Sequence, residues 1–320
     1  MDAPRPLHVV FGAGQIGMPL ARRLIAVGHE VHVVRRSATT TGEGIPMVSG
    51  DAGDPGFVTE VTRGATTIYH CMNPAYSTAV WSHELPRLMT SLIEAAARNG
   101  SRLVVLDNLY MFGPMSGRPM NEDTPVAPSS RKGEIRARVA GMALQAHRAG
   151  RARVTIGRAC DYYGPGGVQT YFGEMFWRRV LAGRSAQVLT PPDVPHTFHL
   201  TTDVAAGLAT LGTDPGDDVC GRWWMLPAAR PLALRGLVDA FGRALGRRIP
   251  IQRIPSAMLA VMGWFVPLLR ELPEMRYQWT EPYLIDDRRF RTRFGATPTP
   301  IEQGAVTTVA WARATFGVGR

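Results

Sequence analysis

The chain has few cysteines. Its 320 residues include three, Cys71, Cys160 and Cys220, which lie far apart in the sequence. Three cysteines cannot form a fully paired disulfide framework, and none of them has the spacing of a metal-binding pair. The sequence therefore predicts a protein of a reducing compartment, with the cytoplasm as the expected location and without a metal site.

Long apolar segments are also missing. The longest apolar-rich run, residues 257–269, is too short to cross a bilayer as a helix. The first residues contain no basic segment followed by a long apolar one, and a strand-like run begins at His8. These features predict neither a secretory signal nor a membrane anchor, so we expect no membrane partner.

Lysine is nearly absent, although the chain is basic. Lys and Arg together number 36 against 26 Asp and Glu, a formal net charge of +10, yet Lys132 is the single lysine. The arginines are spread along the chain in pairs and form no basic stripe, which argues against a nucleic-acid partner and favours a small anionic ligand. A lysine retained among so many arginines is a candidate functional residue.

Short apolar runs alternate with helix-like segments through the first half of the chain. Strands are predicted at 8–11, 31–34, 67–71, 103–106 and 154–156, and helices at 17–28, 80–99 and 136–149. This alternation is typical of a doubly wound parallel sheet with helices on both faces, the α/β Rossmann arrangement. After residue 158 the elements become shorter, with helices predicted at 171–181 and 203–211.

We therefore expect two domains. Residues 1–160 would form a Rossmann domain, completed by a return segment at about 195–215, and residues 161–320 would form a smaller α/β substrate-binding lobe. The region 255–283 of this lobe is rich in Met, Trp and Tyr. Such residues favour a weakly polar substrate, although most often they serve only as core.

A glycine pattern lies between the first predicted strand and the first predicted helix. Gly12, Gly14 and Gly17 have the Gly-x-Gly-x-x-Gly spacing. The first glycine permits a tight turn, the second lets a pyrophosphate approach the backbone, and the third lets the helix pack closely on the strand. The helix N-terminus, at Gln15 and Ile16, supplies backbone N–H donors and a positive dipole. This context predicts a dinucleotide cofactor; the alternative is a tight turn without a ligand.

The residues after the second predicted strand indicate which dinucleotide binds. Arg35 and Arg36 stand about 20 residues after the glycines, where a NAD-binding protein carries an acidic residue. Guanidinium groups suit a 2′-phosphate, so the sequence favours NADP(H), with NAD(H) as the second choice; a solvated basic pair is the other interpretation. Asp51 is a candidate partner of the adenine amino group or a turn residue, and Asn73 is a candidate contact of the cofactor ribose.

These residues and three later segments resemble the extended short-chain dehydrogenase/reductase superfamily, the NAD-dependent epimerase/dehydratase family. The likeness extends over nearly the whole chain, and it implies a Rossmann fold with a C-terminal substrate lobe. It rests on Val9–Gly17, Val104–Gly113, Arg158–Pro165 and Phe198–Ala205.

The chain departs from the family's pattern at the glycine turn and at the catalytic positions. The family's glycine spacing would place a glycine where this chain has Phe11. The resemblance puts Asn108 at the family's Ser/Thr position, Lys132 at its tyrosine and Arg136 at its lysine. Residues four apart share one face of a helix. In the family the lysine lowers the pKa of the tyrosine and anchors the ribose, and the tyrosine exchanges a proton with the substrate.

Two residues are candidate proton donors. A nearby guanidinium and partial burial would lower the pKa of Lys132 from its ordinary value of about 10.4. Tyr110, on the loop after the fifth strand, offers a phenol in place of the missing tyrosine, and Asn108 would orient a carbonyl through its amide. Arg136 would keep the anchoring role. Alternatively, Lys132 and Arg136 form a phosphate-binding or solvated helix face without proton chemistry.

The sequence thus predicts an NADP(H)-dependent oxidoreductase that moves a hydride between the nicotinamide and a small carbonyl or alcohol substrate. The alternatives are an epimerase or dehydratase, in which the cofactor is reduced and reoxidised within one turnover, and a dinucleotide-binding regulator without catalysis. A homodimer is the family-level expectation. Cys160 is interpreted as a core residue, and His196 and His199 as structural histidines, with a substrate contact, as the resemblance implies for their segment, as the alternative.

Overall fold

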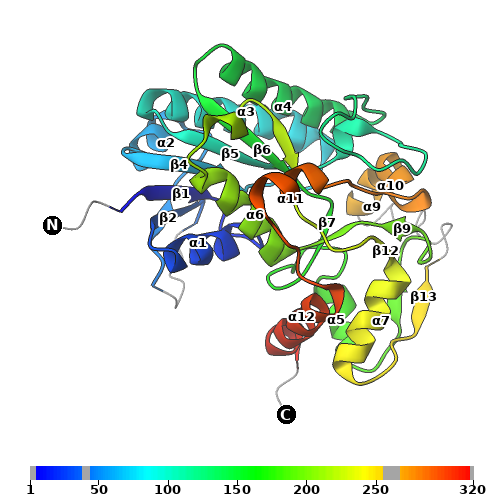
Figure 1. The fold of residues 1–320 in the computed structure, drawn as a ribbon. Helices are drawn as coiled ribbons and strands as arrows, with labels where there is room; N and C mark the ends of the chain where they lie inside the picture. Colours follow the sequence, from blue (N-terminus) through cyan, green and yellow to red (C-terminus); the bar gives the residue numbers. More distant parts are fainter. Residues whose placement is uncertain (1–4, 38–43, 255–266, 318–320) are drawn as a thin grey trace.

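The computed structural model describes residues 5–37, 44–254 and 267–317. Its centre is a seven-stranded sheet (Figure 1). From one edge to the other the strands are β3 (Met47–Ser49), β2 (Glu30–Arg35), β1 (Leu7–Phe11), β4 (Ala65–His70), β5 (Arg102–Asp107), β6 (Arg153–Arg158) and β11 (Trp223–Met225). All neighbouring pairs in this sheet are parallel, which confirms the predicted doubly wound arrangement.

The strand order creates a switch point between β1 and β4. The chain adds β2 and β3 on one side of β1 and then returns to its other side, where it builds β4, β5 and β6 outward. At such a point the connections leave the sheet in opposite directions, and a crevice opens outside the carboxyl ends of the two strands. Gly12 directly follows β1 at this crevice, and Cys71 directly follows β4.

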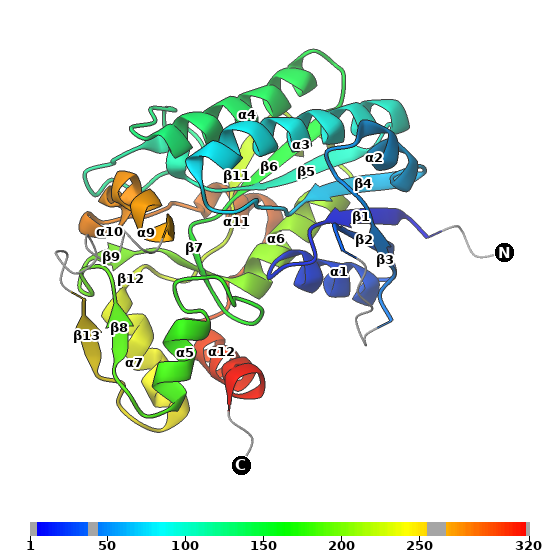
Figure 2. The ribbon, with the colours of Figure 1, turned by 180° about the vertical axis from the view of Figure 1, so that it is seen from behind.

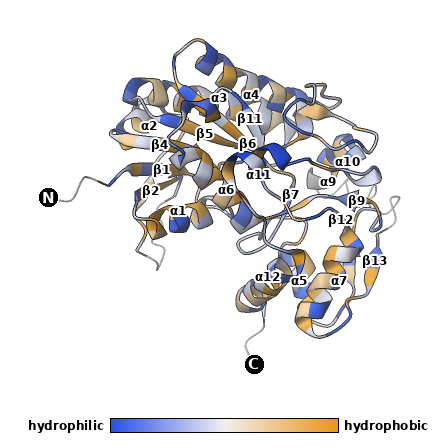
Figure 3. Cartoon of the chain, in the orientation of Figure 1, coloured by the Kyte–Doolittle hydropathy of each residue, from blue (hydrophilic) through white to orange (hydrophobic). Residues whose placement is uncertain are grey.

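Helices cover both faces of the sheet (Figures 1 and 2). One face carries α2 (Pro55–Val61), α3 (Thr78–Asn99) and α4 (Arg131–Arg148), and the other carries α1 (Gly17–Ala26), α6 (Thr201–Thr213) and α11 (Arg288–Phe294). Along β5, Leu103 and Val105 face the layer of α2, α3 and α4, and Val104 faces the layer of α1, α6 and α11. Because both faces are buried, apolar residues fill most positions of the central strands, and β5 is coloured largely hydrophobic in Figure 3.

A smaller lobe lies beyond the carboxyl end of the sheet, and β6 leads into it within two residues. It has its own aromatic core, which includes Phe172, Trp177 and Phe241. Its helices are α5 (Glu174–Leu181), α7 (Leu234–Leu245) and α12 (Ile301–Phe316). Three two-stranded sheets complete it: β7 (Asp161–Tyr163) with β10 (Phe198–Leu200), β8 (Ala186–Val188) with β13 (Ile251–Arg253), and β9 (Pro195–His196) with β12 (Leu232–Ala233).

Short turns and helices connect these parts. They are η1 (Tyr110–Phe112), η2 (Asp217–Val219) and η3 (Pro273–Met275), each a single 3₁₀ turn, with α9 (Pro267–Glu271) and α10 (Tyr277–Thr280). Within the described part of the chain, no helix combines the length and the apolar character that crossing a membrane requires.

Two predicted helix starts were displaced. The helix predicted at 136–149 begins at Arg131, because Ser130 caps it: the Ser130 hydroxyl accepts a hydrogen bond from the N–H of Gly133 at 3.1 Å. The helix predicted at 171–181 begins only at Glu174, after Gly173. The domain boundary at 160 stays a prediction. Besides the expected return segment at about 195–215, strand β11 also leads back to the large domain, where it forms the edge of the sheet beside β6.

Candidate active site

The glycine turn has the geometry that its spacing suggests. Gly12 has a φ of +110°, which side chains rarely tolerate, and a Cβ there would stand 2.8 Å from the carbonyl oxygen of Cys71 at the end of β4. A Cβ on Gly17 would overlap the carbonyl oxygen of Gly12. These two glycines therefore allow strand β1, the turn and helix α1 to come together.

Gly14 differs from both, because within the described residues, its own chain neighbours aside, no atom lies within 4 Å of a Cβ built on it. The space in front of its backbone is open, as close approach of a phosphate requires. Ile16 is buried in the core, so it offers a ligand only its backbone, at the start of α1. The loop after β7 packs against the turn, since a Cβ built on Gly166 would stand 3.2 Å from the Gln15 Cα. The open backbone at Gly14 therefore leaves room for a pyrophosphate at the N-terminus of α1.

The next candidates lie at the ends of β2 and β3. Arg35 pairs in register with Ser49 of β3, is half-buried and donates a hydrogen bond to the Ser37 hydroxyl at 3.3 Å. Arg36 is exposed. Asp51 accepts hydrogen bonds from Arg87, with 2.9 Å between Oδ2 and Nη1, and these bonds lower the pKa of its carboxyl group. The charge of Arg36 contributes to the same lowering, so the arginine pair and Asp51 share one neighbourhood.

Arg136 joins the ends of three elements. Its guanidinium is buried on α4, donates to the Asn73 side-chain oxygen at 2.6 Å and lies 3.4 Å from an Asp107 carboxylate oxygen at the end of β5. It also lies 4.4 Å from the ring centre of Trp81. Its Nε–H has no hydrogen-bond partner within the described residues. Asn73, the predicted ribose contact, and Arg136, the predicted anchor, are thus in direct contact with one another.

Asn108 and Tyr110 follow β5 on a short 3₁₀ turn. The Asn108 side-chain oxygen accepts the backbone N–H of Tyr110 at 3.1 Å, so it shapes this turn. The Tyr110 ring stacks on Trp81, with 6.1 Å between ring centres. Burial raises the pKa of Tyr110 well above its ordinary value, and Tyr76 and the Asp161 carboxylate raise it further. The phenol therefore stays protonated at neutral pH.

Lys132 lies on the same buried face of α4, but its surroundings differ from the predicted ones. The fully buried ammonium forms ion pairs with Glu271 and Glu274 and donates to the Thr78 hydroxyl at 2.9 Å. It also lies 4.8 Å from the ring centre of Tyr76. Two carboxylates stabilise its charged form, whereas the prediction invoked a neighbouring guanidinium. The lysine thus links α3 and α4 to the segment of α9 and η3.

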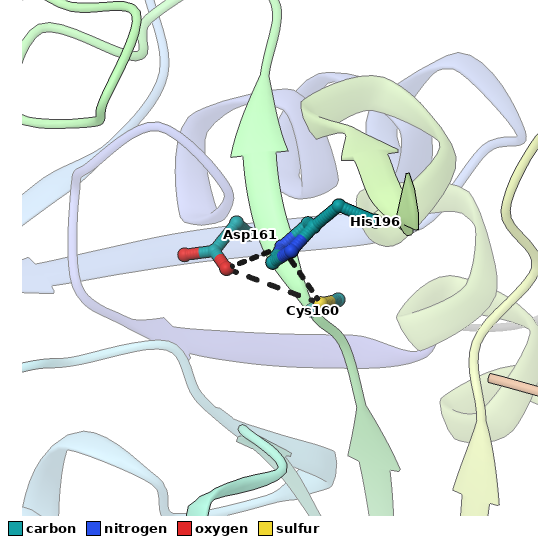
Figure 4. A group of neighbouring side chains, drawn as sticks. All are labelled: Cys160, Asp161 and His196. Atoms are coloured by element: carbon teal, nitrogen blue, oxygen red, sulfur yellow. Dashed lines mark hydrogen bonds and ion pairs between the residues drawn. The ribbon is translucent and has the colours of Figure 1, made fainter. Parts of the chain in front are cut away.

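The sequence analysis did not identify the group around Asp161, the first residue of β7. Its carboxylate lies 2.8 Å from Nε2 of His196 on β9, and the Cys160 sulfur lies 3.6 Å from the same nitrogen (Figure 4). The His196 ring is 4.3 Å from that of Trp279 and tilted by 9° against it. Elements distant in sequence supply these residues, so no local motif marks them.

The structure also shows the surroundings of His199 and of part of the methionine- and aromatic-rich region. His199 is buried as predicted, and its Nδ1 accepts the Cys160 N–H at 3.0 Å. The sequence analysis also missed Tyr76, whose only sequence signal is its place on the loop after β4. In the methionine- and aromatic-rich region, Tyr277 and Tyr283 pack near this site, and residues 255–266 lie outside the described part of the chain.

Comparison with known proteins places the chain in a family. The model of the NAD-dependent epimerase/dehydratase family matches residues 8–222, more than half of the chain. A search of curated proteins finds no match.

Solved structures share the fold at low sequence identity. A protein of Burkholderia cenocepacia J2315 is 17% identical with a TM-score of 0.79 over 98% of this chain and 100% of its own. The UDP-glucuronic acid 4-epimerase of Bacillus cereus, solved with NAD, is 13% identical with a TM-score of 0.77 over 98% of both chains. The dTDP-glucose 4,6-dehydratase of Bacillus anthracis, also solved with NAD, is 15% identical with a TM-score of 0.77 over 97% of both. By its matched sequence, the chain belongs to the NAD-dependent epimerase/dehydratase family.

Proposed function

We propose that this protein is an NADP(H)-dependent oxidoreductase that transfers a hydride between the nicotinamide and the carbonyl group of a weakly polar small molecule. The observation that carries the proposal is the position of the Tyr110 phenol. It stacks on Trp81 just after β5, the strand that neighbours β4 at the switch point. A dinucleotide cradle and a protonated donor therefore share one edge of the sheet.

The cofactor would lie across the ends of β2, β1 and β4. The open backbone at Gly14 and the N-terminus of α1 would hold the pyrophosphate, and the pair Arg35 and Arg36 would hold a 2′-phosphate. Arg136 would donate to the ribose near the nicotinamide, because its Nε–H has no partner within the described residues. When bound, NADPH supplies the hydride.

Tyr110 is the proton donor in this proposal. A hydride that reaches the carbonyl carbon leaves a developing alkoxide on the oxygen, and this oxygen takes the phenol proton to complete an alcohol. The phenol is protonated at neutral pH, and the alkoxide is a base strong enough to take its proton; solvent then returns a proton to the phenolate. Asn108 holds the backbone of Tyr110 in its turn, so it is a positioning residue. Lys132 has a structural role here, because two carboxylates hold its ammonium.

The charges around the site favour a substrate without phosphate groups. Arg136 faces Asp107, and Lys132 faces Glu271 and Glu274. Each of these cations already has a carboxylate partner, whereas a diphosphate needs cations that are free to bind it. Aromatic rings contribute the remaining surface, among them Tyr76, Trp81 and Trp279. This lining suits an aromatic or apolar aldehyde or ketone.

Family membership keeps a second candidate open, an epimerase or dehydratase that reduces and reoxidises its cofactor within each turnover. Such an enzyme would retain its nucleotide through purification and show no net oxidation of NADPH. A regulator without catalysis would bind the nucleotide and show no turnover in either assay. Net oxidation of NADPH with a carbonyl substrate favours the oxidoreductase over both.

The test is the variant Tyr110→Phe, which removes the hydroxyl and keeps the ring on Trp81. We expect kcat for NADPH-dependent reduction across a panel of apolar aldehydes and ketones to fall by about 100-fold or more, with unchanged NADPH affinity. Tyr163→Phe is the matched control, because that hydroxyl is buried in the small lobe without a partner in the described structure. Unchanged turnover in Tyr110→Phe would remove Tyr110 from the mechanism.

Lys132→Arg separates the two predicted donors. Arginine keeps the charge but cannot give up a proton near neutral pH. We expect its turnover to stay within about threefold of the wild type. A loss as large as that of Tyr110→Phe would move proton donation to Lys132.

A further inference from the structure

Cys160, Asp161 and His196 bring three different metal-binding atoms together at the entrance to the small lobe (Figure 4). The distances are 3.6 Å from the Cys160 sulfur to His196 Nε2, 4.0 Å from the sulfur to Asp161 Oδ2, and 2.8 Å from Nε2 to Oδ2. Thiolate, imidazole and carboxylate are the three ligand types that proteins offer to Zn²⁺. The mechanism proposed above uses none of them as an acid or a nucleophile.

The histidine is oriented as a ligand would be. Its Nδ1 lies 3.2 Å from the backbone carbonyl oxygen of Gln278, a group that only accepts hydrogen bonds, so Nδ1 carries a proton. Nε2 points at the Asp161 carboxylate and the Cys160 sulfur, and at 2.8 Å from a carboxylate oxygen it needs a proton or a cation between the two atoms. Stacking on Trp279 fixes the ring plane. Metal-binding histidines are commonly held in this way, with the other nitrogen bonded to a carbonyl.

We propose that Cys160, Asp161 and His196 form a binding site for a divalent cation of the zinc type. Ordinary Zn²⁺ bond lengths in a tetrahedral site place sulfur about 3.6 Å from nitrogen and oxygen, and nitrogen about 3.4 Å from oxygen. The three observed distances differ from these by at most about 0.6 Å, which a small side-chain movement covers. Sulfur and nitrogen ligands favour Zn²⁺ or Co²⁺ over Mg²⁺ or Ca²⁺.

The fourth position would open toward the candidate active site. Cys160 is 6% exposed and the His196 side chain 2%, so the protein encloses the site on those sides. The Asp161 side chain is 29% exposed, and its charge acts on the hydroxyls of Tyr110 and Tyr76. A site with three protein ligands and one open position accepts an oxygen atom from water or a small molecule. This inference does not depend on hydride transfer.

Cobalt(II) tests the proposal without any turnover assay. The full chain, without a histidine tag, is titrated with Co²⁺ and followed in the near ultraviolet, where thiolate coordination gives a charge-transfer band. We expect one equivalent to bind with this band and Zn²⁺ to displace it. Cys160→Ser should lose the band, and His196→Gln and Asp161→Asn should bind Co²⁺ at least about tenfold more weakly.

The matched controls are Cys220→Ser, a buried cysteine outside the cluster, and His83→Gln on the surface of α3. Both should keep the band and the affinity of the wild type. Absence of the band in wild-type protein, or its persistence in Cys160→Ser, overturns the proposal and leaves a histidine–aspartate ion pair. If Cys160→Ser fails to fold by thermal melting, the wild-type spectrum and the isosteric Asp161→Asn variant still decide.

Discussion

The three glycines of the nucleotide turn serve two different physical purposes. Gly12 and Gly17 are required by the protein itself, because a Cβ at either position meets backbone atoms. Gly14 is exposed and faces open space, so the folded chain has no steric need for a glycine there. Its absence of a side chain is useful only if a ligand approaches the backbone.

This difference gives a paired prediction. Gly14→Ala should leave the free energy of unfolding within about 0.5 kcal/mol of the wild type, because nothing is displaced. It should nevertheless weaken dinucleotide binding by at least about tenfold, since the methyl group occupies the approach of the phosphate. Gly17→Ala should cost about 1–3 kcal/mol of stability as well as binding. Urea unfolding measures the stability of each variant, and nucleotide titration measures its affinity. An unaltered affinity in Gly14→Ala would contradict a phosphate at that position.

Single residues differ in how far the sequence alone could place them. The glycines, Arg35 and Arg36 were found because their meaning depends on position relative to one strand and one turn. Asp161 and His196 were not, because β7 and β9 bring them together from 35 residues apart. The surroundings of Lys132 could not be predicted either, because its partners Glu271 and Glu274 lie more than 130 residues away in the sequence.

At the scale of elements, the interface of α4 with α9 and η3 depends on one buried cation. Lys132 is fully enclosed, whereas the side chains of Glu271 and Glu274 are each 25% exposed. Removing the cation leaves two carboxylates facing each other in a partly buried place, which is more costly than the loss of a surface ion pair.

Lys132→Met should therefore lower the free energy of unfolding by about 3 kcal/mol, measured as a shift of the urea midpoint. Adding Glu271→Gln and Glu274→Gln to Lys132→Met should recover at least half of that loss, because the uncompensated charges are then gone. Lys132→Arg should lose less than Lys132→Met. Equal stability of wild type and Lys132→Met would refute this role for the ion pair.

The strands and helices of the large sheet could be predicted because they are long and buried on both faces. Strand β5 gives a continuous apolar run of four residues and β1 one of three, whereas β2, β4 and β6 combine shorter apolar runs with His, Thr or Gly. The strands of the small lobe and β11 have only two or three residues, which is too short for any periodic signal. Their pairing comes from tertiary contacts, so the sequence predicted the lobe but not its sheets.

For the whole molecule, three buried histidines make stability depend on pH. Burial lowers the pKa of His8 and that of His199 to about 4 and that of His70 to about 3. In the unfolded chain all three titrate near the ordinary value of about 6.5. Between these values the unfolded chain binds protons that the folded chain excludes. The stabilisation is therefore complete above pH 6.5 and is lost as the pH falls.

Each histidine should contribute a slope of about 1.4 kcal/mol per pH unit between pH 6 and pH 4. Urea unfolding at a series of pH values measures the slope. His70→Asn, which retains an acceptor for the N–H of Met72, should make it shallower by that amount. His83→Asn is the control, because that side chain is 77% exposed. Equal slopes for His70→Asn and wild type would contradict a neutral buried His70.

The most direct test of the proposed function as a whole is a parallel titration of the nucleotide-free protein with NADPH and NADH at moderate salt, where nonspecific attraction of phosphates is screened. We expect NADPH to bind at least about tenfold more tightly, because Arg35 and Arg36 meet the 2′-phosphate. Equal or tighter binding of NADH would contradict the role of the arginines, and binding of neither would contradict the cofactor site itself.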